Sequence, residues 1–178
     1  IKNRKSIITM VARLDEIKDH ETLIKSFLSL KNDKWVLQFV GGGQKEDYLK
    51  NLVNSLNGNK SIKFLGSRND VLKILSNTDI FAFSTTIKEG FGIVLIEALS
   101  MGIPIIATDV PACREVLMDG KAGILVPERN IKIWQNKLSS LMESENKRSL
   151  LANKAKKLSK FYDIKLVGTE YIKLLNDI

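Results

Sequence analysis

Short apolar segments alternate with longer amphipathic segments along this chain of 178 residues. The apolar segments are rich in β-branched residues and predict strands over residues 6–12, 35–40, 62–65, 79–84, 104–107 and 123–126. Apolar residues at helical spacing predict helices over residues 21–30, 45–56, 70–75, 92–101, 110–118, 131–142, 146–160 and 164–178. Alternation of strands and helices is typical of βαβ units. The pattern therefore predicts one α/β domain, a doubly wound, Rossmann-like parallel sheet of about six strands with flanking helices.

The residues that stand out chemically follow the predicted strands. Arg13 follows the first strand, the glycines 41–43 follow the second, residues 66–68 follow the third, and Glu89 follows the fourth. Doubly wound sheets bind ligands at the carboxyl ends of their strands. We therefore expect a ligand site at that edge of the sheet.

The turn after the fourth strand reads Glu89-Gly90-Phe91-Gly92 and leads into a predicted helix. Its glycines let the backbone pass close to a ligand, and the free amides of the helix N-terminus favour an anion. Glu97 lies among apolar neighbours on that helix, where a carboxylate needs hydrogen-bond donors such as a ribose diol. Taken alone, Glu89 also fits a solvated turn and Glu97 a surface position.

Arg13 and Lys18 lie in the loop after the first strand. Two cations beside a helix N-terminus can neutralise a pyrophosphate without a metal ion, although by themselves they fit a charged surface loop more readily. The three glycines 41–43 are a weak signal and fit a simple loop equally well. They lack the Gly-x-Gly-x-x-Gly pattern, which argues against binding of NAD.

The segment around Glu89 resembles a known family. EGFG at residues 89–92, EAL at 97–99 and GIPIIAT at 102–108 together resemble the donor-binding motif of retaining GT-B glycosyltransferases of family 4. The resemblance runs by motif from Ile7 to Val126, and beyond it by helix pattern. It implies that the chain is the C-terminal, donor-binding domain of such an enzyme.

The resemblance also implies roles for individual residues. It makes Glu89, Arg13 and Lys18 catalytic: Glu89 holds hydroxyls of the donor sugar, and the two cations hold the diphosphate leaving group. Ala12 stands where the family usually has glycine, and His20 stands near its frequent Lys-Gly. The implied donor-binding residues are Glu97 at the ribose hydroxyls, the backbone amides of Gly90, Phe91, Gly92 and Ile93, the glycines Gly41 and Gly43, and Leu65 and Arg68 in the loop facing the base.

The implied function is transfer of a hexosyl group from a nucleotide-diphosphate sugar to an acceptor, with no metal ion or cofactor. The implied partner is an N-terminal acceptor-binding domain of the same protein, which is expected to be absent from this chain, so the isolated domain should be inactive. A nucleotide-sugar epimerase or a non-catalytic nucleotide-binding module of the same fold is the alternative. A glycoside hydrolase carboxylate pair is rejected because it gives Arg13 and Lys18 no role.

The composition adds a net charge of +8 at pH 7. This charge fits the solvated surface of a lysine-rich protein, an anionic substrate, or an anionic membrane surface. A nucleic-acid-binding module would need basic and aromatic residues on one face, which the sequence does not show. No apolar run approaches the ~20 residues of a membrane span, so we expect a cytoplasmic protein, with a peripheral place at the inner membrane face as a second possibility. The basic residues crowd toward the C-terminus, away from the motif: Lys147, Arg148, Lys154, Lys156, Lys157, Lys160 and Lys165.

Three further residues are expected to have no catalytic role. His20 is the only histidine, and we expect it to be exposed near a helix start rather than to act as a base. Cys113 is the only cysteine, which excludes an internal disulfide, and we expect a small, partly buried residue. Glu115 matches an Arg-Glu pair of the family, but capping or packing of the next loop explains it equally well.

Overall fold

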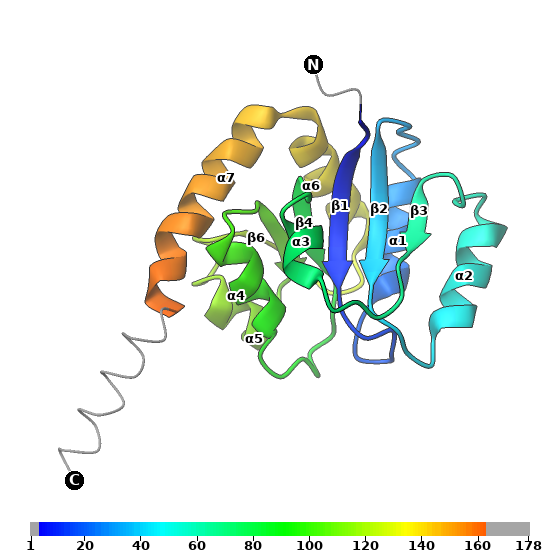
Figure 1. The fold of residues 1–178 in the computed structure, drawn as a ribbon, viewed down its shortest axis with the longest axis horizontal. Coiled ribbons are helices and arrows are strands. Elements are labelled where there is room, and N and C mark those ends of the chain that lie inside the picture. Colours follow the sequence, from blue (N-terminus) through cyan, green and yellow to red (C-terminus); the bar gives the residue numbers. More distant parts are fainter. Residues whose placement is uncertain (1–3, 163–178) are drawn as a thin grey trace, which may run out of the picture.

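The computed structural model describes residues 4–162 and shows one parallel sheet of six strands (Figure 1). The strand order is β3-β2-β1-β4-β5-β6, the order of a doubly wound sheet. The predicted fold class is therefore confirmed. The strands are β1 (Ser6–Val11), β2 (Trp35–Val40), β3 (Ile62–Phe64), β4 (Ile80–Phe83), β5 (Ile105–Thr108) and β6 (Ile124–Val126).

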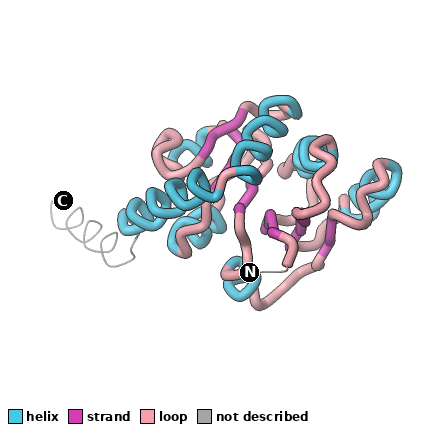
Figure 2. Tube along the Cα trace, turned by 90° about the horizontal axis from the view of Figure 1, so that it is seen from above, coloured by secondary structure: helices cyan, strands magenta, loops and turns pink. Residues whose placement is uncertain are grey.

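Helices connect the strands and cover both sides of the sheet (Figure 2). Their ends differ from the predicted ones by a few residues, and the helix expected over residues 146–160 ends in a short 3-10 turn, η1 (Ser159–Tyr162). The helix predicted over residues 164–178 lies outside the described residues. The helices are α1 (His20–Leu28), α2 (Glu46–Ser55), α3 (Val71–Leu75), α4 (Ile93–Ser100), α5 (Pro111–Val116), α6 (Ile131–Glu143) and α7 (Glu145–Leu158).

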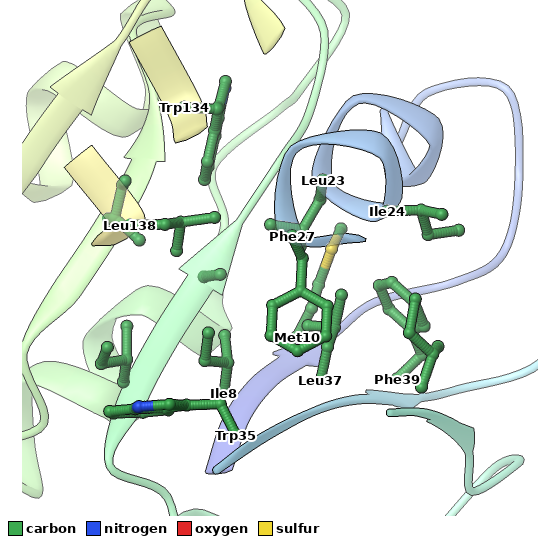
Figure 3. Packing of buried hydrophobic residues seen from close by; sticks show 14 of the residues in the cluster. Ile8, Met10, Leu23, Ile24, Phe27, Trp35, Leu37, Phe39, Trp134 and Leu138 are labelled. Atoms are coloured by element: carbon green, nitrogen blue, oxygen red, sulfur yellow. The ribbon is translucent and has the colours of Figure 1, made fainter. Parts of the chain in front are cut away.

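Two apolar clusters lie on opposite faces of the sheet. Successive strand residues point to opposite faces, so Ile80 and Ala82 of β4 join one cluster while Phe81 and Phe83 join the other. The first cluster packs the sheet against α1 and α6, and it includes the fully buried Trp134 of α6 (Figure 3). Because both faces are covered, the strands read as continuous apolar runs rather than as alternating ones.

The described part of the chain, residues 4–162, holds no helix with both the length and the apolar character needed to span a bilayer.

Candidate functional site

The strands β1 and β4 are neighbours at the centre of the sheet, with Ile8 opposite Ile80. From β1 the chain proceeds to β2 and β3 on one side before it returns to β4 on the other. The loops that follow β1 and β4 therefore diverge at a topological switch point, where sheets of this kind form a ligand-binding crevice.

Backbone hydrogen bonds fasten these two loops to each other. The amide of Asp19 donates to the carbonyl of Ser84 over 3.0 Å, and the amide of Thr86 donates to the carbonyl of Ile17 over 2.9 Å. Lys18 and Thr85 form an antiparallel bridge between these bonds. The first loop therefore has a fixed position relative to the turn that follows β4.

The bridge brings the side chains of Lys18 and Glu89 into a direct ion pair. The two side chains are only 10% and 9% exposed. The hydroxyl of Thr85 donates to the same carboxylate oxygen over 2.9 Å, and the ammonium lies 4.8 Å from the centroid of the Phe83 ring. Because the pair is shielded from water, its attraction is weakly screened and both groups are held in place.

A cavity of about 550 Å³ opens beside this ion pair. Its walls come from the end of β1 and the start of the next loop, from the end of β4, and from the turn before α4. Lys18 and Glu89 contribute to the wall, together with the exposed ring of Phe91. The remaining lining residues are Val11, Ala12, Arg13, Phe83, Gly92, Ile93 and Val94.

Arg13 lies at the open side of the cavity, with its side chain 74% exposed. It pairs with Asp15 over 3.1 Å, and Asp15 in turn accepts a hydrogen bond from the amide of Ile17 over 3.0 Å. The structure thus brings Arg13, Lys18 and Glu89 together, as predicted. Their predicted catalytic roles stay predictions.

The N-terminus of α4 forms the other side of the cavity. Gly92 is its N-cap and adopts a left-handed conformation, with φ 74° and ψ 52°. Within residues 4–162 no side chain caps the helix, so the amides of its first turn have no side-chain acceptor from this part of the chain. A helix N-terminus facing a cavity with two cations suits an anionic ligand such as a phosphate.

Glu97 lies one turn further along α4 and is half-buried. It is not among the described residues that line the cavity. The structure therefore groups Glu89 with the cations and leaves Glu97 beside the site. The predicted contact of Glu97 with a ribose stays a prediction.

Gly41 and Gly43 bring two loops of the chain close together. A Cβ atom added to Gly41 would lie 2.0 Å from the carbonyl oxygen of Ala12, and one added to Gly43 would lie 2.4 Å from that of Leu14. These glycines therefore allow the loop after β2 to pack on the loop that carries Arg13 and Lys18. Their predicted approach to a donor stays a prediction.

Leu65 and Arg68 lie further along the same edge of the sheet. The amide of Leu65 donates to the carbonyl of Phe39, which continues the pairing of β3 with β2. Arg68 makes two hydrogen bonds to Asp70, of 2.8 and 2.9 Å, and these bonds lower the pKa of Asp70. This pair lines a separate pocket of about 320 Å³. The structure therefore does not place Arg68 in the cavity beside the ion pair of Lys18 and Glu89, which we call the Lys18 cavity.

The prediction that His20 is exposed is wrong. His20 begins α1, yet its side chain is only 1% exposed and packs edge-on against Phe39, with ring centroids 5.2 Å apart. The first turn of α1 rests on the end of β2, and the imidazole fills the space between them. Burial lowers the pKa of His20 to about 4, so it is neutral at pH 7.

Two of the remaining residues are not among those that line the cavity. Cys113 is buried, and desolvation raises the pKa of its thiol to about 12, which leaves it protonated. Glu115 is exposed on α5, and its carbonyl accepts a hydrogen bond from Tyr162.

Sequence reasoning missed Thr85, whose hydroxyl donates a hydrogen bond to the Glu89 carboxylate. The sequence did contain one indication of this contact. Thr85 precedes Glu89 by four residues, and the turn between them brings the two side chains together.

The geometry of this cavity, with cations on one side and a helix N-terminus on the other, suits a phosphate-containing ligand. The family model described as "Glycosyl transferases group 1" matches residues 1–158. The chain belongs to this family, and the predicted resemblance to the C-terminal domain of GT-B glycosyltransferases is confirmed.

Two similar proteins come from Campylobacter jejuni. One is named N-acetylgalactosamine-N,N'-diacetylbacillosaminyl-diphospho-undecaprenol 4-alpha-N-acetylgalactosaminyltransferase and is 32% identical over 94% of this chain and 46% of its own length. The other is named N,N'-diacetylbacillosaminyl-diphospho-undecaprenol alpha-1,3-N-acetylgalactosaminyltransferase and is 31% identical over 99% of this chain and 46% of its own length. The chain therefore spans about half the length of these curated relatives.

A solved structure of Anabaena Alr3699/HepE in complex with UDP shares the fold. It superposes with a TM-score of 0.90 at 23% identity, over 98% of this chain and 50% of that one. The catalytic domain of cholesterol-alpha-glucosyltransferase from Helicobacter pylori superposes with a TM-score of 0.75 at 25% identity, over 88% of this chain and 99% of that one.

Proposed function

We propose that this chain is the donor-binding half of a retaining, metal-independent glycosyltransferase that transfers a hexosyl group from a nucleotide-diphosphate sugar. One observation carries the proposal: Arg13, Lys18, Glu89 and the N-terminus of α4 surround one cavity. No observation favours the alternative of an epimerase or a non-catalytic nucleotide-binding module.

The diphosphate would lie between the cations and α4. An ammonium has three donors, so Lys18 can keep its bond to Glu89 and still donate to a phosphate oxygen. Arg13 is exposed and can turn from Asp15 toward the ligand. As the bond to the sugar breaks, negative charge grows on the diphosphate, and these donors would stabilise it in place of a metal ion.

The sugar would lie on the side of Glu89. The Thr85 hydroxyl and the Lys18 ammonium both contact one oxygen of that carboxylate, Oε2. The second oxygen can therefore accept a hydrogen bond from a sugar hydroxyl. Glu89 would orient the sugar through this bond.

The acceptor would bind to a second domain. Since the chain spans about half the length of its relatives, we propose that an acceptor-binding half completes the active site and that this half alone transfers no sugar. The names of the two Campylobacter relatives include diphospho-undecaprenol, so a lipid-linked saccharide is our first candidate acceptor, which would place the enzyme at the cytoplasmic face of a membrane. Transfer by the 178 residues alone would contradict the need for a second half.

Calorimetric titration with nucleoside diphosphates and their hexose derivatives tests the donor site. UDP is the first ligand to try, because similar folds were solved with it. We expect binding that survives EDTA and that weakens at least about tenfold in Arg13→Ala, as for loss of one charge-assisted hydrogen bond. Lys63→Ala, an exposed lysine on β3, is the matched control. Equal affinity in both variants, or no binding by the unaltered chain, would contradict the site assignment.

A further inference from the structure

The helix α7 carries a basic outer face that the donor site does not use. It lies along the outer edge of the molecule, remote from β3 (Figure 1). Residues 146–162 contain six Lys and Arg residues and no Asp or Glu. The inner side of the helix packs against the domain through Leu151, Ala155 and Leu158.

Two large apolar side chains lie within this basic surface. Leu150 is 64% exposed and Phe161 is 65% exposed. Leu150, Lys154 and Lys157 follow at intervals of four and three residues, which places them on one face of the helix. Lys147 precedes them by three residues, and Phe161 follows in η1. We name these five exposed residues, Lys147, Leu150, Lys154, Lys157 and Phe161, the α7 face.

The chemistry of the α7 face matches an anionic lipid surface. Lysine ammonium groups attract lipid phosphates, and their alkyl stems can lie along the boundary between headgroups and acyl chains. Leucine and phenylalanine insert at the same depth. A nucleic acid would bind the lysines through its phosphates, but such binding does not require an exposed leucine. A face that is only in contact with water is not stabilised by either apolar side chain.

We propose that the α7 face docks this domain on the surface of an anionic membrane. The contact is peripheral: the lysines supply the attraction to the charged surface, and Leu150 and Phe161 anchor the helix in the interface. Docking needs no nucleotide and involves no residue of the Lys18 cavity. It can therefore be tested separately from the proposed transfer of sugar.

Co-sedimentation of the full 178-residue chain with vesicles tests the proposal. We expect binding to vesicles of phosphatidylcholine mixed with phosphatidylglycerol, weak binding to phosphatidylcholine alone, and release by salt. Lys154→Glu/Lys157→Glu should lower the partition coefficient at least about 25-fold, at roughly fivefold for each lysine. Leu150→Ser/Phe161→Ser should lower it by about tenfold.

Matched controls use exposed residues of other elements. Lys63→Glu/Lys73→Glu makes the same change in charge on β3 and α3, and Leu72→Ser removes another exposed leucine. Both should bind vesicles as the unaltered chain does, and circular dichroism should show all variants folded. Equal losses in variants and controls, or no preference for anionic vesicles, would overturn the proposal. A nucleic-acid partner would also overturn the proposal. It would appear as tight binding of an oligonucleotide, undiminished in Leu150→Ser/Phe161→Ser, by a chain that does not bind vesicles.

Discussion

At the scale of single residues, the ion pair of Lys18 and Glu89 organises the site. Its two side chains are shielded from water, and the Thr85 hydroxyl provides a second contact to the carboxylate. A buried pair adds little net stability compared with an apolar pair, but losing one partner leaves a charge without compensation. The pair therefore contributes mainly by holding both groups in one position before a ligand arrives.

We expect Lys18→Met to lower the free energy of unfolding by about 3 kcal/mol, because it leaves the buried Glu89 carboxylate without a cationic partner. Lys18→Met/Glu89→Gln should recover most of this loss. Lys25→Met removes a partner from the more exposed pair with Glu21 and should cost less than about 1 kcal/mol. Urea unfolding measures all three. Similar losses in Lys18→Met and Lys25→Met would show that the first pair is not buried in solution.

His20 makes stability depend on pH. Its folded-state pKa of about 4 lies below the ordinary value of 6.5, so the unfolded chain binds the proton more readily between these values. Stability from this group is therefore present above pH 6.5 and is lost as the pH falls toward 4. Lowering the pH from about 7 to about 5 should cost about 2 kcal/mol through His20.

Unfolding of a His20→Phe variant across the same pH range measures this contribution. Phenylalanine keeps the edge-on contact with Phe39 but cannot take up a proton. The variant should lose less stability on acidification than the unaltered chain, by about 2 kcal/mol. Parallel pH profiles for the two proteins would contradict the burial of the imidazole.

At the scale of elements, the loop after β2 supports the loop after β1. Gly41 has φ of +136°, and its Cα faces the carbonyl of Ala12 so closely that no side chain fits. The amide of Leu14 also donates to the carbonyl of Gly42 over 3.0 Å. Arg13 lies between these contacts, so the glycine loop positions a cation of the site.

Gly41→Ala should therefore destabilise the domain by about 3 kcal/mol or more, since the new methyl group meets backbone that cannot move aside. Gly90→Ala is the control, because a Cβ atom there meets nothing within 4 Å. We expect a change of less than about 1 kcal/mol for the control. Thermal unfolding compares the two, and equal shifts would show that the contact between the loops is absent.

Most of the fold was predictable from the sequence because the strands are short, mainly apolar runs with glycine, proline or polar residues close after them. The run of residues 35–40 is one example, since glycines 41–43 end it. The position of His20 was not predictable, because its burial depends on how α1 lies across β2. The grouping of Arg13, Lys18 and Glu89 followed from the switch-point rule, but their pairing did not, because it depends on the bridge between Lys18 and Thr85.

At the scale of the whole molecule, the two proposed surfaces lie on different elements. The Lys18 cavity opens at the carboxyl ends of β1 and β4, whereas the α7 face runs along the outer edge (Figure 1). Residues 146–162 hold six of the 28 Lys and Arg residues of the chain and no acidic residue. On our proposal, this cluster of basic residues contributes to docking on an anionic membrane and not to donor binding.

The position of the bound nucleotide tests the central claim most directly. Backbone amide resonances of the chain, followed by NMR during titration with UDP and UDP-hexoses, report where the ligand binds. We predict that the largest shifts occur in residues 89–94 and 12–18. Shifts confined to residues 19–22 and 25, which line a neighbouring pocket of about 330 Å³ at the start of α1, would contradict the account.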